Sequence, residues 1–297
     1  MLQVVTAGIS CVVGEGHEGW QRWGVPRGGP MDVVAWRAAN VLAGNPHNAA
    51  CVEIALGGAE FEAKRACTVA IAGALSASRD NAPLPPWSSF FLRAGQRLRI
   101  SEGDGARAYL AITGGIGLLP PLGVRWLRDG DCLSALRSAD WTRQAGRLLC
   151  NPFTYHRRLR FLPGPHADRF DLAAFCAQPW RVSPTSNRMG LRLQGQPLHA
   201  RASAEVRTLP VLPGTIQVPP DGLPIVLMMD SQPTGGYPVL GNVLQADLPH
   251  AAQLRPGVEV RFEQVNMAQA VTALATHPPR LYVMELDGDW LAERMQA

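Results

Sequence analysis

Lysine is nearly absent from this sequence: Lys64 is the only lysine among its 297 residues. A nucleotide-binding P-loop needs a lysine in the pattern GxxxxGK[ST] to contact the phosphates, and that pattern does not occur. Lys64 lies in the run Glu-Ala-Lys-Arg, which lacks the Met-Lys-Met context of a biotin carrier. The sequence therefore argues against a P-loop ATPase or a biotin carrier within this chain.

Other missing features narrow the class of protein further. No apolar run reaches the roughly 18 residues that a membrane helix needs, and the first residues lack the basic start and long apolar core of a signal peptide. We therefore expect a cytoplasmic protein without a membrane segment. The six cysteines include no CxxC pair and the seven histidines no HExxH spacing, which predicts reduced thiols and no metal site. A net charge of +4 without a long basic cluster argues against nucleic-acid binding.

Glycine and proline are plentiful, with 30 and 25 residues respectively. They interrupt regular structure, so their density favours many short strands and turns over long helices. Short helices are nevertheless expected at residues 33–43 and 267–276, where apolar residues recur at helical spacing. Segments 92–100 and 254–262 share the pattern L-R-x-G-x-x-[LV]-R-apolar, which indicates an internal duplication.

The most informative stretch lies between residues 215 and 247. Two apolar runs, 216–218 and 225–229, flank the letters PPDG, and this arrangement predicts a hairpin because proline fixes φ and glycine accepts positive φ. A strand that delivers polar side chains to a glycine loop suits ligand binding, although an ordinary glycine turn would give the same pattern. The polar and glycine residues that follow the second run are Asp230, Gln232, Thr234, Gly235, Gly236 and Tyr237.

This stretch resembles the signature of the family of 5-oxoprolinase C subunits, also named KipA, allophanate hydrolase subunit 2 or biotin-dependent carboxyltransferase. The matching letters are IQVPPDG at 216–222, TGGYP at 234–238, ADL at 246–248, QL at 253–254 and PG at 256–257, with Asp230, Gln232 and Gly241. Residues 183–193, SPTSNRMGLRL, are similar to a second fingerprint of the family. Shorter matches in the N-terminal part include Met31-Asp32, Ala39-Asn40 and Glu53.

Two departures from the family pattern bear on activity. Residues 13–17 read VGEGH where relatives usually carry Gln-Asp-x-Gly-Arg, so three polar or charged positions have changed. The Ser/Thr- and Gly-rich insertion that relatives carry after Gly123 is missing. A contact made by these positions in relatives would be altered in this chain.

The resemblance implies a mainly β fold of two cyclophilin-like β-barrel halves with a few short helices. We expect an N-terminal β domain at residues 1–150 and a C-terminal β domain at 151–297, which carries both fingerprints. Residues 134–157 match no motif and are expected to link the halves.

The candidate site residues come from the two fingerprints. Arg188 and Arg192 lie four apart, so on a strand they would share a face and bind a carboxylate or phosphate. An ion pair between Arg188 and an acid such as Asp230 is the alternative. Asp230 and Gln232 are candidates to orient the reacting amide or water, and His17 could act as an acid or base or be a solvated loop histidine. The remaining substrate-binding candidates are Asn187, Gln217, Thr234, Gly235, Gly236 and Tyr237.

Three functions are consistent with the resemblance. The first is a subunit of an ATP-dependent 5-oxoprolinase that is inactive alone and completes its site with a KipI-like protein of the B-subunit type. A LamB/YcsF-like protein of the A-subunit type would also take part, and ATP with Mg would be used through the partners, with no cofactor on this chain. The second is a carboxyltransferase component that acts on an amide or urea nitrogen, and the third is a non-catalytic KipA-like regulatory binding protein.

Overall fold

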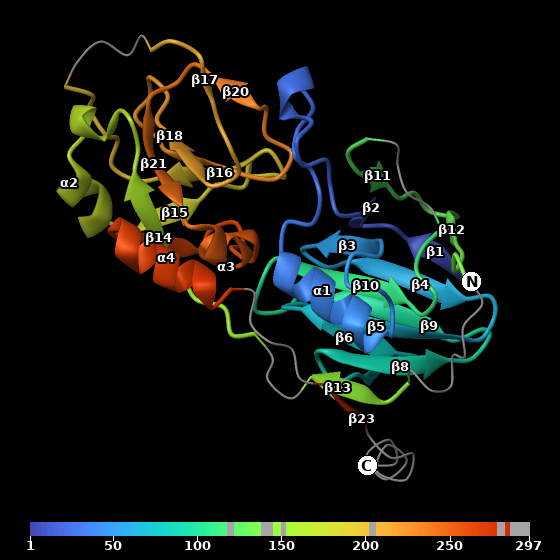
Figure 1. Cartoon of the computed structure of the whole chain (residues 1–297). Helices are drawn as coiled ribbons and strands as arrows, with labels where there is room; N and C mark the ends of the chain where they lie inside the picture. The colour runs from blue at the N-terminus through green and yellow to red at the C-terminus, as the bar shows by residue number, and fades with distance from the viewer. Residues whose placement is uncertain (118–121, 138–144, 150–152, 202–205, 278–282, 286–297) are drawn as a thin grey trace. The chain divides into compact units, whose positions relative to one another are not determined.

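The computed structural model describes residues 1–117, 122–137, 145–149, 153–201, 206–277 and 283–285 (Figure 1). The chain forms two compact units. Unit 1 comprises Met1–Glu15, Val33–Thr154 and Arg280–Ala297, and unit 2 comprises Gly16–Asp32 and Tyr155–Pro279. The chain passes from unit 1 to unit 2 between Thr154 and Tyr155, and the division of the chain at residue 150 stays a prediction. The segment Gly16–Asp32, however, comes from the N-terminal part of the chain and packs with the C-terminal unit.

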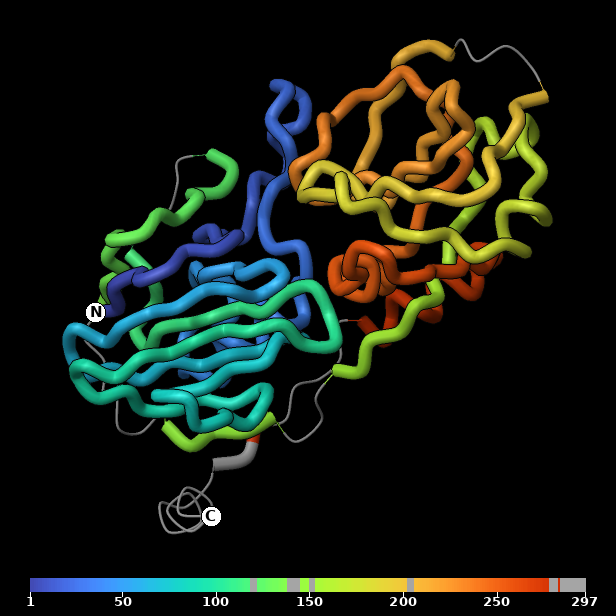
Figure 2. The backbone as a smooth tube through the Cα atoms, turned by 180° about the vertical axis from the view of Figure 1, so that it is seen from behind, coloured from blue at the N-terminus to red at the C-terminus, as the bar shows by residue number. Residues whose placement is uncertain are grey.

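Unit 1 is built from two sheets (Figures 1 and 2). Apolar residues of both sheets share one core cluster, which includes Phe61 from one sheet and Leu110 from the other, so the sheets pack face to face. The helix α1 (Val33–Leu42) packs on strands of the larger sheet. In spatial order the six-stranded sheet contains β12 (Cys132–Leu133), β1 (Leu2–Thr6), β4 (Ala59–Ala63), β9 (Arg97–Ser101), β6 (Ser76–Arg79) and β7 (Ala82–Pro83). The eight-stranded sheet contains β11 (Arg125–Trp126), β2 (Ile9–Val13), β3 (Cys51–Ala55), β10 (Arg107–Ile112), β5 (Cys67–Gly73), β8 (Ser88–Leu92), β13 (Arg147–Leu149) and β23 (Val283–Glu285).

Unit 2 contains a closed seven-stranded barrel. Its interior is filled by large side chains such as Phe161, Phe175 and Trp180, none of which is exposed to solvent. Around the barrel the strands are β14 (Arg158–Pro163), β21 (Val239–Val243), β18 (Thr215–Gln217), β19 (Ile225–Leu227), β16 (Gly190–Gln194), β15 (Trp180–Val182) and β22 (Glu259–Gln264). The parallel pair β14 and β22 closes it, and the other pairs are antiparallel.

The remaining elements of unit 2 are short. A two-stranded ribbon pairs β17 (Leu209–Pro210) with β20 (Thr234–Gly235). The helices are α2 (Leu172–Ala177), α3 (Leu248–Ala252) and α4 (Met267–Ala275), and the 3-10 turns are η1 (Gln21–Trp23), η3 (Ala167–Arg169) and η4 (Gln245–Asp247). Within the described residues no helix is long and apolar enough to cross a bilayer. The prediction of a mainly β fold with few short helices is confirmed.

The predicted hairpin forms as the sequence indicates. Strands β18 and β19 pair with Ile216 opposite Val226. Their turn is closed by a hydrogen bond of 3.0 Å from the Gly222 N–H to the Pro219 carbonyl, with φ of +76° at Gly222. Glycine adopts this left-handed backbone conformation without steric strain because it has no Cβ.

The two copies of the short repeat adopt the same turn. In the first, Gln96 donates to the carbonyl of Arg93, and in the second, Val258 donates to the carbonyl of Arg255. The glycine within each turn has positive φ, and each turn leads into a strand, β9 or β22. The repeat therefore has the same local structure in both units.

A pair of alanine substitutions tests the hairpin turn. A Cβ on Gly222 would approach the carbonyl oxygen of Leu198 at 2.6 Å, in addition to the strain of positive φ. We expect Gly222→Ala to lower the free energy of unfolding by about 2–4 kcal/mol in urea denaturation followed by circular dichroism. The control is Gly257→Ala, with φ of +82° and no described atom within 4 Å of the added Cβ, which should lose only about 1 kcal/mol. Equal losses would contradict the close approach at Gly222.

Candidate functional site

A row of residues crosses the outer face of the unit 2 barrel. Gln217 pairs with Val239 on one side and with Ile225 on the other, and Ile225 pairs with Arg192. Residues directly opposite in antiparallel strands point to the same face of a sheet. The neighbouring residues, such as Ile216, belong to the barrel core, so this row faces outward. The fold thus aligns two of the predicted binding residues, Gln217 and Arg192.

The ribbon strand β20 covers one end of this row. Gln217 is 1% exposed, and a Cβ added to Gly235 would overlap its Nε2 atom. Among the described residues, Gln217 Nε2 has no hydrogen-bond partner. A buried amide without a partner carries a desolvation penalty of about 1–3 kcal/mol, so its presence in a folded protein calls for an explanation. Gly235 therefore packs directly against the Gln217 amide. The sequence placed both residues in one motif but did not indicate this contact.

Arg188 and Asp230 form a largely buried, bidentate ion pair. Arg188 Nε lies 2.8 Å from Asp230 Oδ2, and Nη2 lies 2.9 Å from Oδ1. Arg188 is 6% exposed, and its Nη2 also donates to the carbonyl of Gly29 at 2.7 Å. The structure thus contains the ion pair that was the alternative to direct substrate binding. The Asp230 carboxylate is held in a fixed orientation by this fork.

Arg188 and Arg192 lie in different surroundings. Arg192 is exposed on strand β16, whereas Arg188 is buried in the segment before that strand. Residues 188 and 189 form a bend, and β16 begins only at Gly190, so the two arginines do not lie on one continuous strand. Arg192 is thus the more accessible guanidinium of the two.

The segment Gly16–Asp32 brings His17 toward Asp230. The N–H of Gly28 donates to the carbonyl of Met229 at 2.8 Å, directly before Asp230. The half-buried His17 lies beside Gly28, because a Cβ there would be 3.9 Å from its Cδ2. His17 also lies 5.7 Å from the ring of Trp20. Segments far apart in the sequence therefore meet around Asp230.

The other predicted site residues are mostly at the surface. The Oδ1 atom of Asn187 accepts the N–H of Met189 at 2.8 Å, so this side chain shapes the turn before β16. Tyr237 is 47% exposed. The exposed members are Asn187, Arg192, Gln232, Thr234, Gly236 and Tyr237.

A buried polar network adjoins the segment that holds Gly29. Asp32, with no exposure, accepts a 2.6 Å hydrogen bond from the hydroxyl of Tyr155 and a 2.8 Å bond from Gln253 Nε2. Burial, followed by the negative charge of Asp32, raises the pKa of Tyr155 well above its usual value, so the phenol remains a donor. No spacing in the sequence links these three residues, although Asp32 and Gln253 both match the family pattern.

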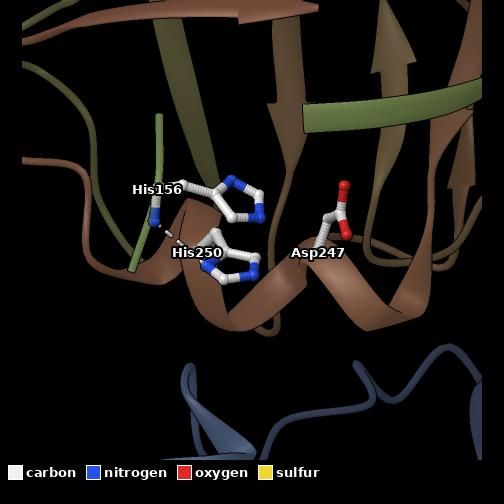
Figure 3. A group of neighbouring side chains, drawn as sticks. All are labelled: His156, Asp247 and His250. Atoms are coloured by element: carbon white, nitrogen blue, oxygen red, sulfur yellow. Dashed lines mark hydrogen bonds between the residues drawn. The ribbon is translucent and has the colours of Figure 1, made fainter. Parts of the chain in front are cut away.

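A second polar cluster contains His156, Asp247 and His250 (Figure 3). Their potential ligand atoms lie within 4.8 Å of one another, but both Asp247 oxygens and His250 Nδ1 already accept hydrogen bonds. Arg160 Nη2 lies 2.5 Å from Asp247 Oδ1, and His250 Nδ1 accepts the backbone N–H of His156 at 3.3 Å. The two imidazoles stack at 3.5 Å with an interplanar angle of 26°, so their in-plane lone pairs run nearly parallel instead of converging. This geometry suits a stacked hydrogen-bonded cluster better than a metal site.

His250 is neutral in this cluster. Burial, with the nearby charge of His156 as a smaller cause, lowers the pKa of His250 to about 4. The neutral ring can therefore stack on His156 without charge repulsion. Asp247 is fully buried and is balanced by Arg160.

Similarity to known proteins covers nearly the whole chain. The C subunit of 5-oxoprolinase from Escherichia coli is 37% identical over 294 residues, which span 92% of this chain and 94% of that protein. The C subunit of 5-oxoprolinase from Haemophilus influenzae is 33% identical over 271 residues, 86% of this chain and 88% of that protein.

Solved structures share the fold. The crystal structure of TTHA0988 superposes with a TM-score of 0.76 at 35% identity, covering 88% of this chain and 55% of the TTHA0988 chain. This chain thus spans about half the length of TTHA0988. The Kluyveromyces lactis urea amidolyase gives a TM-score of 0.81 over 93% of this chain and 19% of that chain, at 24% identity, which supports the fold alone. The model of the carboxyltransferase domain, subdomain A and B, matches residues 23–264, and the chain belongs to this family.

Proposed function

We propose that this chain is a subunit of an ATP-dependent 5-oxoprolinase, which opens the lactam of 5-oxo-L-proline to L-glutamate. The observation that carries the proposal is its near full-length similarity to two proteins named as C subunits of 5-oxoprolinase. The chain lacks a P-loop, so ATP with Mg would be used through LamB/YcsF-like and KipI-like partners.

The exposure of the candidate site supports a role shared with a partner. Thr234, Gly236 and Tyr237 lie at the surface, and Arg192 is exposed on the outer barrel face. A lactam is stable, and its carbonyl must be activated in a site from which water is largely excluded. An open surface does not exclude water, so we propose that the KipI-like partner covers it.

The geometry suggests a distinct role for each group. Asp230, oriented by Arg188, would hold the ring N–H or the attacking water. The Gln217 amide would donate to a substrate carbonyl or carboxylate after a small shift of the ribbon. Arg192 would bind the substrate carboxylate, which revises the idea of an Arg188–Arg192 clamp. Gln232 and His17 would border the same surface, and the backbone of residues 234–237 would supply further donors.

A carboxyltransferase component is the second candidate. The matching domain family carries that name, and its transfer of carboxylate to a nitrogen would use the same outer face. Because Lys64 lacks a biotin-carrier context, carboxybiotin would have to come from another protein. A non-catalytic KipA-like binding protein would keep the partner surface without using Asp230.

Reconstitution tests the proposed activity. We expect 5-oxoproline-dependent ATP hydrolysis and glutamate formation only when this chain is mixed with its LamB/YcsF-like and KipI-like partners. Asp230→Asn should lower kcat/KM by about 100-fold, because it removes the oriented carboxylate. Asp168→Asn, at an exposed site in η3, is the matched control and should retain full activity. Association without glutamate formation would favour the binding-protein alternative, and carboxybiotin-dependent product would favour the carboxyltransferase.

Adjacent glycines test the role of Gln217. Gly235→Ala would push the Gln217 amide out of place, whereas the nearest atom to a Cβ on Gly236 is Thr208 Oγ1 at 3.8 Å. We therefore expect Gly235→Ala to raise KM for 5-oxoproline at least about tenfold, and Gly236→Ala to leave it within about twofold. Steady-state kinetics of the reconstituted complex give both values. Equal KM values in the two variants would remove Gln217 from the binding site.

A further inference from the structure

The ion pair of Arg188 and Asp230 depends on a third group, the carbonyl of Gly29. Arg188 Nη2 is shared between Asp230 Oδ1 at 2.9 Å and Gly29 O at 2.7 Å. A shift of the Gly29 carbonyl would therefore change the direction in which the guanidinium presents its donors to the carboxylate. The position of residues 28–32 is thus linked to the orientation of Asp230.

These residues are attached to the barrel at separate points. Gly28 donates to Met229 O at 2.8 Å, and the side chain of Met31 is fully buried in the barrel core. At the end of the segment, Asp32 Oδ2 accepts bonds from Tyr155 and Gln253. All of these partners belong to unit 2.

The Asp32 anchor joins three distant parts of the chain. Tyr155 opens the C-terminal portion of unit 2, and Gln253 follows helix α3. Asp32 itself directly precedes α1. Because Asp32 and Gln253 are buried and both donors meet one oxygen, the anchor fixes the end of the segment more strictly than an exposed contact would.

We propose that Asp32, held by Tyr155 and Gln253, is a positioning residue for the Arg188–Asp230 pair. It acts through the Gly29 carbonyl and touches no reacting atom. The inference rests on the proposed function for its kinetic consequence, but its structural consequence can be measured without any activity.

The chain offers a closely matched control. Tyr109 in unit 1 is fully buried, and its hydroxyl donates to Glu53 Oε2 at 2.6 Å, the same length as the Tyr155–Asp32 bond. Tyr109→Phe and Tyr155→Phe therefore remove the same kind of phenol–carboxylate bond. Only Tyr155 belongs to the anchor of residues 28–32.

Hydrogen–deuterium exchange and kinetics of the full chain test the proposal. In Tyr155→Phe we expect the amides of Gly28, Gly29, Met31 and Asp32 to exchange at least about tenfold faster, since Pro30 has no N–H. We also expect kcat of the reconstituted complex to fall about tenfold, with KM within about twofold. Tyr109→Phe should change neither quantity. Gln253→Met removes the other donor to Asp32 and should have the same effects as Tyr155→Phe. It tests the proposal independently in the event that Tyr155→Phe folds poorly.

The outcomes separate this inference from the proposed function. Unchanged exchange at residues 28–32 in both anchor variants would overturn the positioning role, whatever the activity. Equal effects of Tyr155→Phe and Tyr109→Phe would overturn it as well, because they would reflect general stability alone. Faster exchange in the anchor variants, together with no 5-oxoprolinase activity in the unaltered chain, would support the anchor while rejecting the proposed reaction.

Discussion

The ion pair of Arg188 with Asp230 constrains much of unit 2. Removing the Asp230 carboxylate would leave the buried Arg188 charge uncompensated, which typically costs about 3–5 kcal/mol. The pair therefore requires the loop before β16 and the end of β19 to stay together, and backbone bonds from Met228 to Met189 and from Asp230 to Arg188 reinforce that contact. The two fingerprints of the sequence meet at this point.

The packed barrel interior determines where ligand chemistry can take place. Phe161, Phe175 and Trp180 fill the inside at close distances, with ring centroids of Phe161 and Phe175 only 5.4 Å apart. A small polar substrate would have to displace this core. The outer face instead presents Gln217 beneath the ribbon and Arg192 in solvent. Because the barrel interior is filled, the candidate site lies on the outer face of the barrel, which is accessible to a partner protein.

Local signals were sufficient to predict several elements from the sequence. The PPDG turn, the helix α4 with its Asn266–Gln269 capping box and the helix α1 all follow from residue types within a few positions of one another. Contacts between segments that are distant in the sequence were not predictable in this way. Residues 134–157, expected to be a linker, include strand β13, whose formation depends on pairing with β8 and β23.

The same distinction applies to the site. The motifs identified the candidate residues. They did not predict that Arg188 is buried while Arg192 is exposed, or that Gly235 packs against the Gln217 amide. The packing of Gly16–Asp32 with unit 2 had no local signal, because its contacts with Met229 and Arg188 span about 160–200 residues of sequence, and only tertiary structure brings such segments together. His156 and His250 likewise have no recognisable spacing along the chain.

The altered loop at residues 13–17 can be judged from these contacts. His17 lies beside Gly28, whereas Arg188 binds the next residue, Gly29. The altered side chain therefore borders the site without replacing any group of the ion pair or of the Asp32 anchor. The contacts that orient Asp230 do not involve His17, so the change at residue 17 alters the surroundings of the candidate site and leaves the Arg188–Asp230 pair unaffected. Under the proposed function, the change at residue 17 would therefore alter a contact at the edge of the site and leave the oriented Asp230 carboxylate in place.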